Sequence, residues 1–138
     1  MSTPIPILVI DDQPHIVDLL SRAAKNIFPQ AQFIALPSFE QAVAYLRELK
    51  EPFPRLVLLD IDLQSAQSGF DFLALFRQHP KVRLVPVIVL SVDRSQSEQA
   101  YDRGANAFTH KPESLAGWQL YVQQLQNFWF KVATLPKL

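Results

Sequence analysis

Short apolar runs alternate along the chain with longer segments in which apolar residues recur every three or four positions. The apolar runs cover residues 5–10, 32–36, 56–59, 87–90 and 105–110. Strand-like runs separated by helix-like segments are typical of a parallel sheet covered by helices. The pattern therefore predicts an α/β domain built from five βα units.

Start and stop signals bound the helical segments. Pro14 suits the first turn of the first helix. Ser38 and Ser95 each begin a Ser-x-x-Gln or Ser-x-x-Glu capping box, so they are expected to open the second and fourth helices. Gly104 is expected to close the fourth helix. The last helix is predicted over about residues 115–130.

Composition narrows the function classes. The chain has 138 residues, of which 49% are hydrophobic, enough for one domain with a core of its own. Thirteen basic and thirteen acidic residues give a net charge of zero, which argues against nucleic-acid or membrane binding by bulk charge. The absence of cysteine excludes disulfides and thiolate chemistry. Without a signal peptide or a membrane-length apolar run, we expect a cytoplasmic protein.

Polar side chains follow four of the five predicted strands. They are Asp11, Asp12, Asp60, Asp62, Ser91 and Lys111. Because the carboxyl ends of parallel strands meet at one edge of the sheet, these side chains are expected to lie close together around a ligand site. Several carboxylates in one place raise one another's pKa unless a cation compensates them. Oxygen ligands of this kind suit Mg²⁺.

The remaining polar groups point to phosphoryl chemistry. Lys111 supplies a positive charge and Ser91 a hydroxyl donor, and both suit a phosphoryl oxygen. An aspartate can itself be the nucleophile and form an aspartyl phosphate. The residues therefore predict a phosphoacceptor site that uses Mg²⁺.

These residues, in this order, resemble the receiver domains of two-component response regulators over essentially the whole chain. The resemblance implies a doubly wound, flavodoxin-like α/β fold with sheet order 2-1-3-4-5. It implies a single receiver domain over residues 1–138, with a core of about 5–128 and a tail over 129–138. It also implies a signalling protein that is not an enzyme, beyond its own phosphoryl transfer and dephosphorylation.

The resemblance assigns a role to each site residue. Asp60 would accept the phosphoryl group, and Asp11, Asp12 and Asp60 would hold Mg²⁺ together with the backbone carbonyl of Asp62. Ser91 and Lys111 would contact the phosphoryl oxygens.

A switch follows from the same resemblance. Phosphorylation of Asp60 would draw Ser91 toward the new oxygens and let Phe108 turn inward. This movement would change the face made by the fourth helix, the fifth strand and the fifth helix. The Lys111–Pro112 peptide bond is expected to be cis.

The loop after the phosphoacceptor departs from the receiver pattern. Residues 61–69 lack the usual proline and form a slightly long loop, with an additional carboxylate at Asp62. This carboxylate could slow phosphorylation, alter the lifetime of the phosphoryl group or touch the metal, and the sequence leaves these alternatives open.

A narrower resemblance concerns partners. Residues 101–108 and 127–136 resemble single-domain regulators that are paired with cyanobacterial and bacterial phytochrome kinases. The implied upstream partner is a light-regulated sensor histidine kinase, homodimers are expected, and the downstream protein is unknown.

The last predicted helix is apolar over a wide arc. One apolar stripe for the core consists of Trp118, Val122, Leu125, Trp129 and Val132. Tyr121, Phe128 and Phe130 lie outside that stripe, and large exposed aromatic side chains usually mark an interface. We therefore assign these three to an interface, with a tail that folds back over them as the alternative.

Some features of the sequence also occur in other protein classes. Asp60-Ile61-Asp62 resembles the start of a haloacid-dehalogenase-type phosphatase, but the acidic pair precedes it and Gln64 stands where that family has Thr. A receiver-like scaffold independent of phosphorylation is a further alternative. A flavodoxin-like cofactor binder would need a phosphate loop that the chain lacks, and a DNA-binding regulator would need an output domain.

Overall fold

Five parallel strands form one sheet in the computed structural model, which describes residues 3–138. The strands are β1 (Ile5–Ile10), β2 (Ala31–Leu36), β3 (Leu56–Leu59), β4 (Val87–Ser91) and β5 (Ala107–His110). Their order, β2-β1-β3-β4-β5, confirms the predicted doubly wound α/β fold. All five strands therefore end at the same edge of the sheet.

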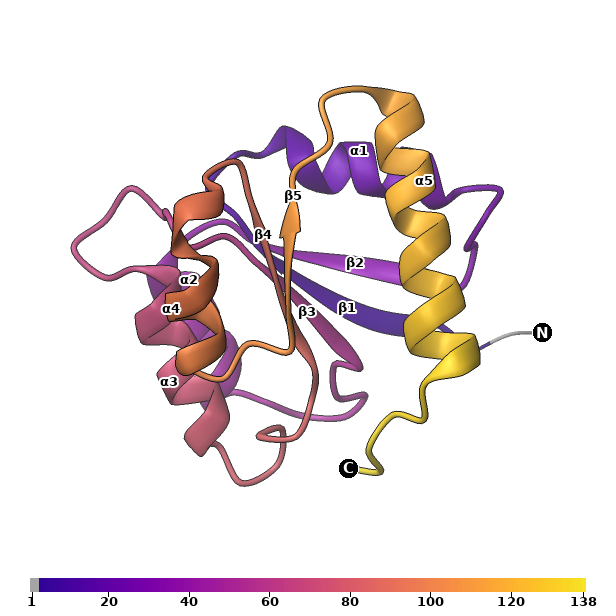
Figure 1. The fold of residues 1–138 in the computed structure, drawn as a ribbon. Coiled ribbons are helices and arrows are strands. Elements are labelled where there is room, and N and C mark those ends of the chain that lie inside the picture. The colour runs from indigo at the N-terminus through magenta and orange to yellow at the C-terminus, as the bar shows by residue number, and fades with distance from the viewer. Residues whose placement is uncertain (1–2) are drawn as a thin grey trace.

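Helices cover both faces of the sheet. They are α1 (His15–Ala24), α2 (Phe39–Arg47), α3 (Gly69–Gln78), α4 (Ser97–Asp102) and α5 (Leu115–Leu125), with a 3₁₀ turn η1 (Arg94–Gln96) and a π-helix η2 (Gln126–Val132). Figure 1 shows α1 and α5 on one face and α2, α3 and α4 on the other. Among the described residues, none of these helices has the length and apolar character needed to cross a membrane.

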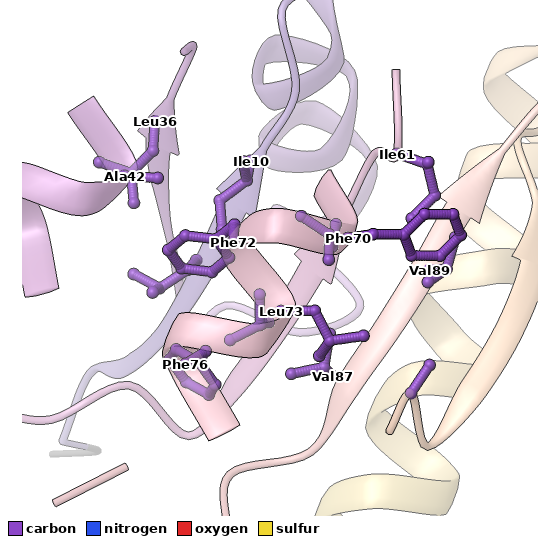
Figure 2. Close-up of a cluster of buried hydrophobic side chains, with 14 of the residues drawn as sticks. Ile10, Leu36, Ala42, Ile61, Phe70, Phe72, Leu73, Phe76, Val87 and Val89 are labelled. Carbon is purple, nitrogen blue, oxygen red and sulfur yellow. The ribbon is translucent and has the colours of Figure 1, made fainter. Parts of the chain in front are cut away.

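The sheet separates two cores. Along β1, Leu8 and Ile10 face α2–α4, whereas Ile7 and Val9 face α1 and α5. Because both faces are covered, β3 is apolar at every position and β4 is apolar at every position before Ser91. In Figure 2, Phe72, Leu73 and Phe76 from α3 reach toward side chains of β1 and β4. These two cores fix the strand ends that carry the polar residues.

One predicted helix cap is wrong and another is confirmed. The predicted capping box at Ser95 is wrong, because Asp93 caps η1 instead: its Oδ1 accepts hydrogen bonds from the Ser95 N–H (2.9 Å) and hydroxyl (2.7 Å). The Asp93 carboxylate thus accepts hydrogen bonds from Ser95, so Ser95 lies inside the turn and does not cap it. The Ser38 cap is confirmed by a 3.1 Å hydrogen bond from the Gln41 N–H.

The end of the chain changes helical period. After Leu125 the backbone continues as η2, whose wider i→i+5 turns rotate the following residues relative to an α-helix. As a result Phe130 packs against the core beside Phe28, with ring centroids 5.3 Å apart. Val132, which the predicted stripe placed inward, is 67% exposed.

The predicted interface residues separate into two groups. Tyr121 packs against the core, and its hydroxyl lies 2.8 Å from Thr109 Oγ1, while burial raises the pKa of Tyr121. Tyr121 and Phe130 are therefore partly buried against the chain's own core instead of fully exposed, and their role in an interface stays a prediction. Phe128 is 51% exposed, and its role in an interface stays a prediction.

A pair of substitutions tests this arrangement. Phe130→Ala removes the contact with Phe28 and is expected to lower the free energy of unfolding by about 1–2 kcal/mol, measured by urea denaturation. Phe128→Ala, on an exposed side chain, is expected to cost about 0.5 kcal/mol. Equal losses for the two variants would contradict the packing of η2.

Candidate functional site

The polar residues predicted from the strand ends come together at the carboxyl edge of the sheet. Asp11 follows β1, Asp60 follows β3, Ser91 ends β4 and Lys111 follows β5. All four residues are buried, and each has 5–8% of its surface exposed. Beside them lies an open cleft of about 400 Å³, whose lining includes Asp12, Asp60, Ser91 and Lys111.

A buried lysine holds the centre of the site. Lys111 Nζ lies 2.7 Å from Asp11 Oδ2 and 3.2 Å from Asp60 Oδ2. Burial by itself lowers the pKa of Lys111, but the contact with Asp11 and the charges of Asp60 and Asp11 outweigh it and raise that pKa. Lys111 is therefore a stable cation that partly compensates the two buried carboxylates.

The carboxylates outnumber this cation. Oxygen atoms of Asp11, Asp12 and Asp60 lie within 4.8 Å of one another. Burial raises the pKa of Asp60 to about 6; the charge of Lys111 opposes this shift and the charge of Asp11 adds to it. Asp11 Oδ2 is buried, and its partner is the Lys111 ammonium. Three clustered carboxylates and one ammonium leave excess negative charge, and this all-oxygen cluster fits a divalent cation.

The loop after β3 organises Asp60 without adding a fourth acid to the cluster. The Asp62 N–H donates to Asp60 Oδ1 at 3.1 Å. The Asp62 carboxylate accepts hydrogen bonds from the Gln64 N–H (3.1 Å) and from Gln64 Nε2 (3.0 Å). Gln64 adopts a left-handed backbone with φ of 54° to make this turn. A place for the Asp62 carbonyl in a metal shell stays a prediction.

Ser91 and Phe108 occupy the neighbouring strands. The Ser91 hydroxyl accepts from the Asp93 N–H (3.1 Å) and donates to the Asp93 carbonyl (3.3 Å), while it also borders the cleft. Phe108 is half-buried against the core, and its N–H donates to the Tyr101 hydroxyl at 3.1 Å. Both predicted switch residues therefore have partners in this conformation.

The prediction of a cis Lys111–Pro112 bond is wrong. Within residues 3–138 the cis peptide bond is Glu51–Pro52, so Lys111–Pro112 is trans. Trans is the ordinary lower-energy form of such bonds. Just before this trans bond, the Lys111 N–H donates to the Ser91 carbonyl at 3.0 Å and so continues the pairing of β5 with β4.

Sequence reasoning missed the role of Gly69. Its N–H donates to the Ile61 carbonyl at 2.7 Å, and a Cβ at this position would collide with the backbone carbonyl of Asp60. α3 starts here with a capping box between Ser68 and Asp71. A lone glycine after a polar loop and before an apolar helix was the available signal.

We expect Gly69→Ala to disturb the loop that carries Asp60. The added methyl group meets backbone that cannot move aside, so the free energy of unfolding should fall by about 2–3 kcal/mol in urea denaturation. Gly117→Ala is the matched control, because its methyl group meets the Pro112 and Ser114 side chains at 3.0 and 3.3 Å and it lies within α5. If Gly69→Ala lost less free energy of unfolding than Gly117→Ala, the close approach of residue 69 to the Asp60 carbonyl would be refuted.

The raised pKa of Asp60 makes stability depend on pH. In the folded protein without metal, this carboxyl binds its proton up to about pH 6, whereas its ordinary value is 3.8. The contribution of Asp60 to the free energy of unfolding is therefore fully present below pH 3.8. It is lost as the pH rises through about 6. In chelator at pH 8, Asp60→Asn should therefore be more stable than wild type by about 1–2 kcal/mol after allowance for solvent screening. Urea denaturation should show this gain shrinking toward pH 4, and a gain independent of pH would contradict the assignment.

Comparisons with known proteins agree with this geometry. Residues 7–123 match the family model described as the response regulator receiver domain. The response regulator Rcp1 of Synechocystis sp. is 28% identical over 139 residues, which cover 96% of this chain and 94% of Rcp1.

Solved structures give the same result. The phosphorylated cyanobacterial phytochrome response regulator RcpA superimposes with a TM-score of 0.85 at 27% identity, over 98% of this chain and all of RcpA (100%). The Mn²⁺-bound form of Rcp1 has a TM-score of 0.81 at 28% identity, over 97% of this chain and 100% of Rcp1.

Proposed function

The chain belongs to the response regulator receiver family, and we propose that it accepts a phosphoryl group on Asp60 from a sensor histidine kinase. The observation that carries this proposal is the position of Asp60 relative to Lys111 and the cleft. Asp60 borders the cleft and also contacts Lys111, whereas Asp11 contacts Lys111 without lining the cleft. Asp60 is therefore the carboxylate that can both meet a phosphodonor and have its charge compensated.

The transfer is a substitution at phosphorus. An Asp60 carboxylate oxygen forms the new O–P bond, the P–N bond of a phosphohistidine breaks, and the leaving imidazole takes up a proton from water. The attacking carboxylate must be ionised, and a pKa of about 6 leaves Asp60 mostly ionised at neutral pH. The Asp62 N–H and Lys111 hold its two oxygens in place.

Mg²⁺ fits the acidic cluster. Asp11, Asp12, Asp60 and the backbone carbonyl of Asp62 would hold it, in keeping with the Mn²⁺-bound form of the similar Rcp1. When bound, it would compensate the carboxylates and the incoming phosphoryl charge. Lys111 and Ser91 would contact the phosphoryl oxygens from the other strands.

A change of partner surface would follow. To donate to a phosphoryl oxygen, the Ser91 hydroxyl has to give up the hydrogen bond that it donates to the Asp93 carbonyl. Phe108 lies on the adjacent strand opposite Val89, two positions before the partner of Ser91, and would then turn further inward. The surface of α4, β5 and α5 would change, and with it the binding of a downstream protein.

The partners are inferred from the relatives. Rcp1 and RcpA are similar over nearly their full lengths, and RcpA is a phytochrome response regulator, so we assign a phytochrome histidine kinase as the upstream partner. We further propose a cytoplasmic receiver over residues 1–138, which signals through protein contacts. A homodimer that uses exposed Phe128 is part of this proposal.

Phosphorylation can be tested directly. Wild type incubated with Mg²⁺ and a small phosphodonor should gain the mass of one phosphoryl group, and chelation of the metal should suppress the gain. Asp60→Asn should gain nothing, because it removes the nucleophile. Asp18→Asn, which changes an exposed aspartate on α1, is the matched control and should behave as wild type. Light scattering on the same samples measures the oligomeric state.

The alternatives predict different results. A scaffold independent of phosphorylation would show no mass gain in the wild type under any condition. A phosphatase of the haloacid-dehalogenase type would release phosphate from monoesters with multiple turnovers. Either outcome would defeat the proposed function.

A further inference from the structure

One exposed residue contacts both members of the buried ion pair. The backbone N–H of Gln13 donates to Asp11 Oδ1 at 2.9 Å. The side-chain carbonyl of Gln13, Oε1, accepts a hydrogen bond from Lys111 Nζ at 3.2 Å. Gln13 also lines the cleft, as Lys111 and Asp60 do, so it borders the space that a phosphodonor would enter.

Gln13 completes the surroundings of the ammonium group. An ammonium has three N–H donors on a flexible stem, so its direction is set by its acceptors. Lys111 Nζ contacts three oxygens, which belong to Asp11, Asp60 and Gln13. Two of these come from the β1–α1 loop and do not react, whereas the third is on the carboxylate expected to be phosphorylated.

We propose that Gln13 is a positioning residue for phosphoryl transfer, which acts through Lys111. Together with Asp11 it holds the ammonium so that the donor now directed at Asp60 Oδ2 meets the incoming phosphoryl oxygen. This inference rests on the proposed function.

The amide group suits this role because it is neutral. A carboxylate at position 13 would add a fourth acid beside Asp11, Asp12 and Asp60 and would repel an anionic phosphodonor. A side chain without an acceptor would leave one donor of Lys111 to water and hydrate the ion pair. An amide oxygen accepts the hydrogen bond without adding charge.

The first test observes Lys111 without any phosphorylation. The buried ammonium protons exchange slowly when all are bound, so the ¹⁵Nζ signal of Lys111 should be visible by NMR in the wild type. In Gln13→Ala that signal should broaden or disappear, because one N–H faces water. Gln13→Glu, which retains an acceptor of the same length, should restore the signal.

The second test measures transfer. With a small phosphodonor and Mg²⁺, the maximal phosphorylation rate of Gln13→Ala should fall about three- to tenfold, with the half-saturating donor concentration unchanged. Gln13→Glu should also be slower despite its restored NMR signal, because of its charge. Gln67→Ala, an exposed glutamine on the neighbouring loop, is the matched control and should match the wild type in both tests.

The outcomes separate the two proposals. If the wild type is not phosphorylated, the proposed function fails. If the wild type is phosphorylated and Gln13→Ala keeps both its Lys111 signal and its rate, only the role of Gln13 is refuted. A lost signal with an unchanged rate would also overturn it, because the contact would then be structural alone.

Discussion

The structure is organised around a single buried ammonium that faces more negative charge than it can neutralise. Lys111 contacts Asp11 and Asp60, while Asp12 adds a third carboxylate, with an oxygen within 4.8 Å of theirs. Burying such charges is costly unless each is paired, and the cost appears as the raised pKa of Asp60. The unmodified site is thus under-compensated, and a bound divalent cation would relieve that deficit. The rest of the fold serves to keep these side chains together.

The parallel sheet supplies this placement. Asp11, Asp60 and Lys111 directly follow β1, β3 and β5, and the two cores on either face of the sheet hold those strand ends in place. Gly69 lets α3 start against the Asp60 carbonyl, so the loop after the acid is as constrained as the strand before it. A site built on strand ends and helix starts needs little reorganisation when a ligand arrives.

Most of the fold and the central site could be predicted from the sequence, because both follow from local signals. Apolar runs locate the strands, and parallel topology brings their polar ends together. Features that depend on long-range packing could not be predicted in this way. The contact between Gln13 and Lys111 joins residues 98 positions apart, and the π-helical turns of η2 accompany the packing of Phe130 on Phe28, which is distant in the sequence. Asp93 and Ser95 can both cap a helical turn, and the sequence alone does not tell which of them caps this one.

The hydrogen bond from the Phe108 N–H to the Tyr101 hydroxyl has a further consequence for association. β5 is an edge strand, and edge strands with free N–H groups attract extended chains that prolong the sheet. Here the chain uses its own tyrosine to occupy an outward-facing donor of that edge. An extended chain that added to this edge would first have to displace the tyrosine hydroxyl from the Phe108 N–H. The side chain on α4 thus protects this point of the sheet edge against strand addition.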